Sequence, residues 1–218
     1  MGRKRLHDEA TAAALLDAAE AILENEGFEA LTVRRVAVAT GTTTRAVYTS
    51  LGSKDALLAA LCVRAFDLLG ERVAAQPRSA DPAADLVAAG TKGFRAWALD
   101  HPVLFRVGFL HQVSIPADVW SRSETSAERA LGALRERLER VEEAGGLGGR
   151  TLQEATWQFH SLCEGLAIMD LRAGMAGPAS DSLPIWTDAL GALVAGWRAT
   201  GRPSRPGSRR RPPSPVAS

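Results

Sequence analysis

Cysteine, long apolar runs and targeting signals are scarce in this 218-residue chain. The two cysteines, Cys62 and Cys163, lie far apart and form no CxxC pair, which argues against a disulfide framework and suits a reducing compartment. No apolar run reaches the roughly 18 residues of a membrane span. The basic start, residues 3–5, is followed by His7-Asp8-Glu9 rather than by the apolar core of a signal peptide. These absences predict a cytoplasmic protein without a membrane segment.

Fingerprints of common enzyme and cofactor sites are also missing. The chain contains no GxSxG, no phosphate-binding glycine loop and no dinucleotide fingerprint. His160, Cys163 and Glu164 fall within one turn of a predicted helix, and the i,i+4 spacing of His160 and Glu164 can bind zinc, but a third and fourth ligand are not evident. We therefore expect no catalysis, no cofactor and no metal, and we assign these three residues to a pocket lining or a satisfied core.

Alanine, leucine, glutamate and arginine dominate what is present, and β-branched runs are few. This composition, with apolar residues at helical spacing, predicts an all-α protein. About nine helices are expected, over residues 9–25, 33–40, 44–50, 53–75, 82–100, 102–113, 117–144, 151–173 and 184–200.

The predicted helices divide the chain into two domains and a tail. Residues 1–60 make a small helical domain that begins with a basic arm over residues 1–9, and residues 61–200 make a larger one. Residues 201–218 are rich in Arg, Pro and Ser and cannot form a core, so we expect a disordered basic tail. The formal net charge of +1 consists of −1, −3 and +5 in these three parts. A nucleic-acid function therefore cannot rest on overall charge.

The stretch 31–58 predicts two short helices around a tight turn, followed by a third helix. Thr32 and Thr43 are placed to cap the two short helices, and Gly41 supplies a positive φ between them. Such a helix-turn-helix places its second helix in the DNA major groove.

These residues also resemble a known family, the TetR-type transcriptional regulators. The resemblance rests on GFEALT at 27–32, Val36-Ala37, Gly41, Tyr48 and GSKDALL at 52–58. FRAWALDHPVLFR at 94–106 and WQFH at 157–160 look like the C-terminal domain of one branch of that family. The resemblance implies a homodimer that binds a palindromic operator in double-stranded DNA, acts as a repressor and is released by a small-molecule effector. The alternatives are an activator, a ligand-independent DNA-binding protein, or a helical interaction or small-molecule-binding module.

Candidate DNA-binding residues lie in and beside the two short helices. Arg34 and Arg35 oppose the dipole of the helix they begin, which favours a nearby phosphate. Arg45 can read guanine in bidentate fashion. Tyr48 is either a phosphate contact or half-buried core, and Lys54 either a phosphate contact or a solvated side chain. The predicted DNA-binding set is Thr32, Arg34, Arg35, Thr43, Thr44, Arg45, Tyr48, Thr49 and Lys54.

Two further surfaces are predicted in the larger domain. Aromatic residues and the His160 cluster are expected partly in the core and partly around an apolar effector cavity between helices. Small residues in the last two helices allow close packing, either within the subunit or across a two-fold axis. The pocket set is Trp97, Phe105, Phe109, Trp120, Trp157, His160, Cys163 and Glu164, and the dimer set is Leu162, Leu166, Leu190, Leu193, Val194, Gly196 and Trp197.

Overall fold

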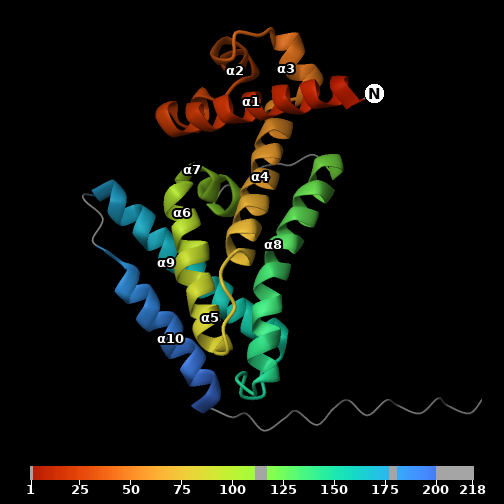
Figure 1. Cartoon of the computed structure of the whole chain (residues 1–218). Coiled ribbons are helices and arrows are strands. Elements are labelled where there is room, and N and C mark those ends of the chain that lie inside the picture. The colour runs from red at the N-terminus through yellow and green to blue at the C-terminus, as the bar shows by residue number, and fades with distance from the viewer. Residues whose placement is uncertain (1, 111–116, 177–180, 200–218) are drawn as a thin grey trace, which may run out of the picture.

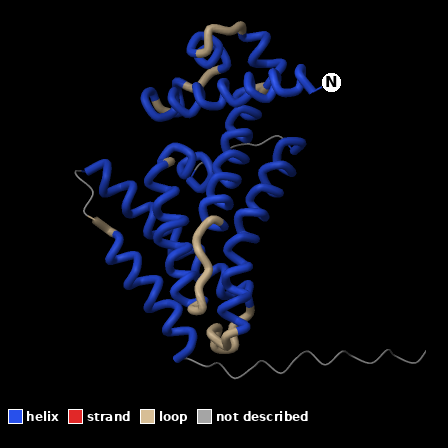
Figure 2. Tube along the Cα trace, viewed as in Figure 1, coloured by secondary structure: helices blue, strands red, loops and turns tan. Residues whose placement is uncertain are grey.

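The protein is described by a computed structural model over residues 2–110, 117–176 and 181–199. Within these residues the chain is helical and contains no strand (Figure 2). Nine helices form over the described ranges if each run with a π-helical segment is counted once, which confirms the predicted fold class. In this described part, no helix combines the length and apolar character that crossing a bilayer requires.

The N-terminal helices form a separate layer at one end of the molecule (Figure 1). Their core consists of small and branched apolar residues from α1, α2, α3 and the first half of α4, with Leu31, Val36, Val47 and Leu57 all at 0% exposure. The elements are α1 (Gly2–Glu26), a 3₁₀ turn (Phe28–Ala30), α2 (Val33–Ala39), α3 (Thr44–Ser50) and α4 (Lys54–Ala74).

Helix α1 is longer than the sequence indicates. It begins at Gly2, whereas we expected a flexible arm before Glu9. The segment 3–6, Arg-Lys-Arg-Leu, contains good helix formers and no breaker, so the helix extends through it. The prediction of a basic arm is therefore wrong for the backbone from residue 2.

The remaining helices form the larger body. Helices α5 (Pro82–Ala88) and α6 (Ala96–Asp100) are joined by a π-helical segment, η2 (Ala89–Arg95), and α7 (Pro102–Phe105) continues into a second one, η3 (Arg106–Leu110). The body is completed by α8 (Ala117–Glu143), α9 (Leu152–Ala176) and α10 (Leu183–Ala199). The periodicity predicted ordinary helices at both π segments. The end of the predicted helix 102–113 and the predicted tail 201–218 lie outside the described residues.

Helix α4 connects the two layers (Figure 1). Leu57 and Leu61 are fully buried near its start, while Leu69 and Val73 are buried near its end, where α4 packs along α8. The helix crosses residue 60 without a break, so the boundary we predicted there falls inside a continuous element. The two layers therefore share one continuous helix.

Candidate nucleic-acid interface and apolar cavity

The turn between α2 and α3 depends on one glycine. Gly41 has φ 65°, a left-handed value that favours glycine. Its N–H donates to Val38 O at 3.3 Å, and the N–H of Thr42 donates to Ala37 O at 2.9 Å. These two bonds close α2 with a Schellman motif. The turn therefore fixes where α3 begins relative to α2.

Both short helices start at threonine caps, as the sequence predicts. The hydroxyl of Thr32 accepts a hydrogen bond from the N–H of Arg35 at 3.1 Å. The hydroxyl of Thr43 accepts one from the N–H of Ala46 at 3.2 Å. A cap of this kind stabilises a helix by about 1 kcal/mol, which matters for helices of two turns. Thr32 and Thr43 thus have structural roles, and their contact with DNA stays a prediction.

Helix α3 presents a polar face to solvent. Val47 is fully buried beneath it, whereas Thr44, Arg45 and Thr49 are exposed. The Tyr48 side chain is 59% exposed, so it lies on the surface rather than half in the core. Arg45 forms no ion pair or side-chain hydrogen bond with any residue that the structure describes. Its guanidinium is available to an external acceptor.

The basic residues around α3 are not equivalent. Arg34 is exposed, but Arg35 forms a bidentate pair with Glu26 at the end of α1, with Nη2 to Oε1 at 2.6 Å and Nε to Oε2 at 3.1 Å. The hydrogen bond lowers the pKa of Glu26 and raises that of Arg35. Lys54 Nζ donates to Phe28 O at 3.2 Å. Arg35 and Lys54 therefore hold the N-terminal helices together, a role that sequence reasoning missed.

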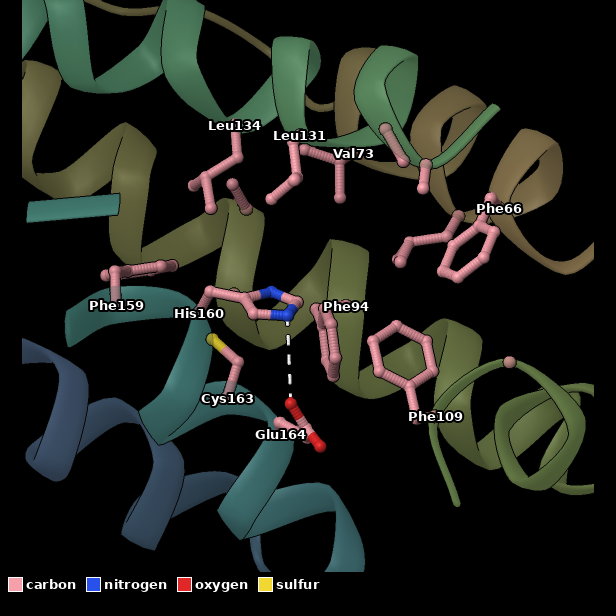
Figure 3. A pocket seen from close by; sticks show the side chains of 16 residues that line it. Phe66, Val73, Phe94, Phe109, Leu131, Leu134, Phe159, His160, Cys163 and Glu164 are labelled. Atoms are coloured by element: carbon pink, nitrogen blue, oxygen red, sulfur yellow. Dashed lines mark ion pairs between the residues drawn. The ribbon is translucent and has the colours of Figure 1, made fainter. Parts of the chain in front are cut away.

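A cavity of about 310 Å³ lies in the larger body between α4, α8, α9 and the two π segments (Figure 3). Its wall is apolar except at one end, where His160 and Glu164 reach it from α9. The lining comprises Phe66, Leu69 and Val73 from α4, Ala89, Gly90, Phe94, Gly108 and Phe109 from the π segments, Ala127, Ala130, Leu131 and Leu134 from α8, and Phe159, His160, Cys163 and Glu164 from α9.

The polar end of the cavity consists of neighbours one helical turn apart. His160 Nε2 lies 3.7 Å from Glu164 Oε2, too far for a hydrogen bond (Figure 3). Burial lowers the pKa of His160, and the attraction of Glu164 offsets this only in part, so the imidazole is neutral at pH 7. Burial also raises the pKa of the Cys163 thiol, so Cys163 contributes a neutral wall. No group of three or more potential metal-binding side chains occurs among the described residues.

The structure brings together half of the predicted pocket residues. Phe109, His160, Cys163 and Glu164 line the cavity. Trp97 (2% exposed) and Phe105 (0%) lie behind its wall, in an aromatic cluster with Phe94 and Phe109. They are core residues because bulky aromatic groups fill the space where the two π segments meet.

The predicted pocket set also contained two other tryptophans, and neither is among the described residues that line the cavity. Trp157 is 65% exposed, because it lies on the outer face of α9. The side chain of Trp120 lies outside the described residues. The lining residues of α4 and α8 were missed, although their signal was present: Phe66, Leu69 and Val73 repeat at helical spacing on a helix too long for the small domain alone.

The predicted dimer residues divide into two groups. Leu190 (0% exposed), Val194 (3%) and Trp197 (1%) are buried inside the subunit, and Trp197 Nε1 donates to Gln158 Oε1 at 2.7 Å. Their assignment to an intersubunit surface is therefore corrected. Helices α9 and α10 are apolar on more than one side, and the bulkier side packs inward. Leu162, Leu166, Leu193 and Gly196 remain partly exposed.

The outward face of these two helices carries small residues and three large ones, Trp157, Met169 and Ile185. On α9, Trp157, Ser161, Gly165 and Met169 follow one another at four-residue spacing, and Met169 is 62% exposed. On α10 the exposed residues include Ile185, Ala192, Ala195 and Ala199. We name these eight residues the α9/α10 outer face.

Comparisons with known proteins agree with this architecture. Residues 15–61 match the family model described as bacterial regulatory proteins, tetR family, and residues 87–193 match that of the tetracyclin repressor-like C-terminal domain. The chain belongs to the TetR family of bacterial regulatory proteins. It is a DNA-binding transcriptional regulator by family and not an enzyme.

Solved structures of the same fold are distant in sequence. A TetR family regulator, PfmR from Thermus thermophilus, is 20% identical, with a TM-score of 0.63 over 83% of this chain and 93% of that one. FadR from Bacillus subtilis, in complex with stearoyl-CoA, is 18% identical, with a TM-score of 0.69 over 84% and 98%. FadR from Bacillus halodurans is 17% identical, with a TM-score of 0.68 over 92% and 97%. No curated protein matches the chain.

Proposed function

We propose that the protein is a homodimeric repressor that binds a palindromic operator and leaves it when a small molecule enters the cavity. The observation that carries the proposal is the arrangement of α3, with Arg45 and Tyr48 exposed on a capped helix behind a fixed turn. Exposed side chains of a second helix in such a motif reach base edges in the major groove. Arg34, exposed at the start of α2, supplies a phosphate contact.

The connection between operator and effector runs through α4. Phe66, Leu69 and Val73 line the cavity, while Leu57 and Leu61 of the same helix are buried in the N-terminal layer. A ligand between α4, α8 and α9 favours one position of α4 and therefore one position of α3. The Bacillus subtilis FadR complex with stearoyl-CoA supports a ligand-binding role for this fold. The ligand releases DNA to the extent that it binds the protein more tightly when α4 is in the position that does not fit the operator than when α4 is in the position that does.

The dimer places two copies of α3 on one operator. One recognition helix covers only a few base pairs, and two copies bind half-sites about one helical turn or more apart. The α9/α10 outer face is the surface we assign to this contact, because exposed Trp157 and Met169 stand beside small residues that allow close helix approach. A two-fold contact between two such helix pairs is a four-helix bundle.

Binding-site selection tests the proposal directly. The full chain is incubated with random-sequence duplex DNA, the bound fraction is amplified and sequenced, and affinity for the enriched site is measured by fluorescence anisotropy. We expect a palindromic site, and we expect Arg45→Ala to enrich a site whose preference is relaxed at one base pair of each half. Absence of any enriched sequence contradicts specific DNA binding. Enrichment of a site without two-fold symmetry contradicts only the dimer.

A further inference from the structure

The polar end of the cavity, as far as the structure describes it, carries negative charge without a balancing positive charge. Among the described residues that line it, Glu164 is the only acidic one, and none is a lysine or arginine. His160 beside it is neutral at pH 7, because burial lowers its pKa. An anionic ligand would therefore meet a carboxylate with no cation to offset it, at a cost that rises in an apolar surrounding.

The Glu164 carboxylate also lacks a hydrogen-bond donor within the described residues. His160 Nε2 is 3.7 Å away from Oε2, and no N–H or O–H of the described chain donates to the carboxylate. The side chain is one-third exposed and faces the cavity (Figure 3). A ligand with an N–H or O–H group at this point supplies the hydrogen-bond donor that the carboxylate lacks.

Aromatic rings surround the same end. The ring centroids of Phe94 and Phe109 each lie 5.9 Å from that of His160, and Phe66 packs edge-on against Phe109 at 5.6 Å. Phenylalanine rings attract a cation over their faces and accept hydrocarbon beside it. At about 310 Å³, the cavity is at the small end of ligand sites and suits one ring with a short chain.

We propose that the cavity takes a compact apolar amine, whose ammonium group pairs with the Glu164 carboxylate and whose hydrocarbon body packs among the phenylalanines. This inference rests on the proposed role of the cavity as the effector site and adds the chemical class of the effector.

Three molecules with one skeleton and different head groups test the class: phenylbutylamine, phenylbutanol and phenylbutyrate. Binding to the full-length protein is measured by isothermal titration calorimetry at neutral pH. We expect the amine to bind most tightly, the alcohol next and the acid weakest. Since a charge-assisted hydrogen bond is roughly twice as strong as a neutral one, we expect about ten-fold or more between amine and alcohol. An acid that binds as tightly as the amine overturns the proposal.

Glu164→Gln keeps the shape of the side chain and removes its charge. The variant should weaken the amine about ten-fold to a hundred-fold and leave the alcohol unchanged. Glu139→Gln, an exposed position on α8 away from the cavity, is the matched control and should change neither. Amine binding that survives Glu164→Gln undiminished overturns the pairing.

Leu131→Trp fills the cavity and should abolish binding of all three molecules. Failure of this inference and failure of the effector role give different results. If the amine binds as expected but does not lower operator affinity, the ligand class stands and the effector role fails. If the alcohol or acid lowers operator affinity more than the amine, the effector role stands and the ligand class fails. If none of the three binds, this inference is rejected.

Discussion

Gly90 packs directly against the side chain of Leu190, with no room for a Cβ atom unless that side chain shifts. A Cβ atom on Gly90 would lie 2.4 Å from Cδ1 of Leu190 and 3.1 Å from Cζ of Phe159. Gly90 belongs to the π segment η2 that forms one wall of the cavity, and Leu190 is fully buried in α10. Because Gly90 has no side chain, Leu190 of α10 can pack directly against the segment that forms this cavity wall.

Gly90→Ala should destabilise the protein, although alanine is the better helix former. The added methyl overpacks the contact with Leu190, which costs about 1–3 kcal/mol of unfolding free energy and outweighs the helix gain of about 1 kcal/mol. Gly132→Ala in α8 is the matched control: its Cβ meets nothing within 4 Å, so it should be neutral or stabilising. Urea denaturation measures both. Adding Leu190→Ala should relieve part of the loss, and strict additivity in the double variant contradicts the contact.

Asp85 should make stability fall in acid. It is 6% exposed, and although burial raises its pKa, hydrogen bonds from Arg140 (2.6 Å) and from the N–H and hydroxyl of Ser79 (2.7 Å each) lower it to about 2. A depressed folded pKa gives stability that is present above the unfolded pKa, near 3.8, and is lost as pH falls toward 2.

Asp85→Asn should therefore cost about 1–2 kcal/mol at neutral pH, a cost that shrinks as pH falls from about 5 to about 2. Urea denaturation across this range gives the two curves. The exposed Glu139→Gln is the control and should run parallel to the wild type throughout. A difference between Asp85→Asn and the wild type that stays constant with pH excludes this ion pair as its source.

The C-terminal end of α4 depends on a buried arginine. Arg137 on α8 is 1% exposed, and its Nη2 donates to the carbonyls of Val73 (2.9 Å) and Gln76 (2.5 Å). Arg137→Met removes both bonds, which leaves the Val73 carbonyl with only the N–H of Gln76 at 3.3 Å, so we expect a loss of about 2–4 kcal/mol in urea denaturation. Arg135→Met, exposed on the same helix, should stay within about 0.5 kcal/mol. Equal effects of the two would show that the hydrogen bonds do not stabilise α4.

Much of the fold follows from local chemistry that the sequence displays. The helix starts at Thr32, Thr43 and Asp81-Pro82 agree with the structure because caps and proline act on their own backbone neighbours. The π segments were not predicted: Gly90, in one of them, packs against Leu190 of α10, a contact between distant parts of the chain. The sequence predicted a plain helix there since periodicity carries no information about a distant helix.

The sites were predicted less completely than the fold, for a related reason. Exposed α3 residues could be recognised because that helix has one apolar side. Helices α9 and α10 have apolar or small residues around most of their circumference, so periodicity does not distinguish the core face of Trp197 from the solvent face of Trp157. The pair between Arg35 and Glu26 was missed because it joins two helices whose relative position the sequence does not state.

The arginines that we assign to the DNA interface should behave differently from one another. Arg45→Ala should cost about 1–3 kcal/mol of operator affinity and relax the preference at one base pair. Arg34→Ala should weaken all sequences alike and reduce the salt slope by about one phosphate contact. Arg35→Ala should lower affinity only as far as Glu26→Gln does, because both break the same intramolecular pair. Fluorescence anisotropy over a salt series measures each value. Unchanged affinity for both Arg34→Ala and Arg45→Ala would rule out this placement of the motif.

Gly165→Arg should separate dimerisation from folding. Gly165 is exposed on α9, in the middle of the α9/α10 outer face, and a Cβ there meets nothing within 4 Å in its own subunit. Arginine is also the better helix former by nearly 1 kcal/mol, so the subunit should fold as before. In an isologous interface the substitution occurs twice across the two-fold axis, which buries two unpaired charges at close range.

We therefore expect Gly165→Arg to sediment as a monomer with unchanged circular dichroism and to lose operator affinity, since a single α3 reads only half of the site. Gly132→Arg makes the same chemical change on α8, where a Cβ is equally free, and should remain a dimer that binds operator. Comparison of the two removes any general effect of added positive charge on DNA binding. A Gly165→Arg protein that stays dimeric and binds operator would place the subunit contact on another face, and one that unfolds would show that α9 packs there within its own subunit.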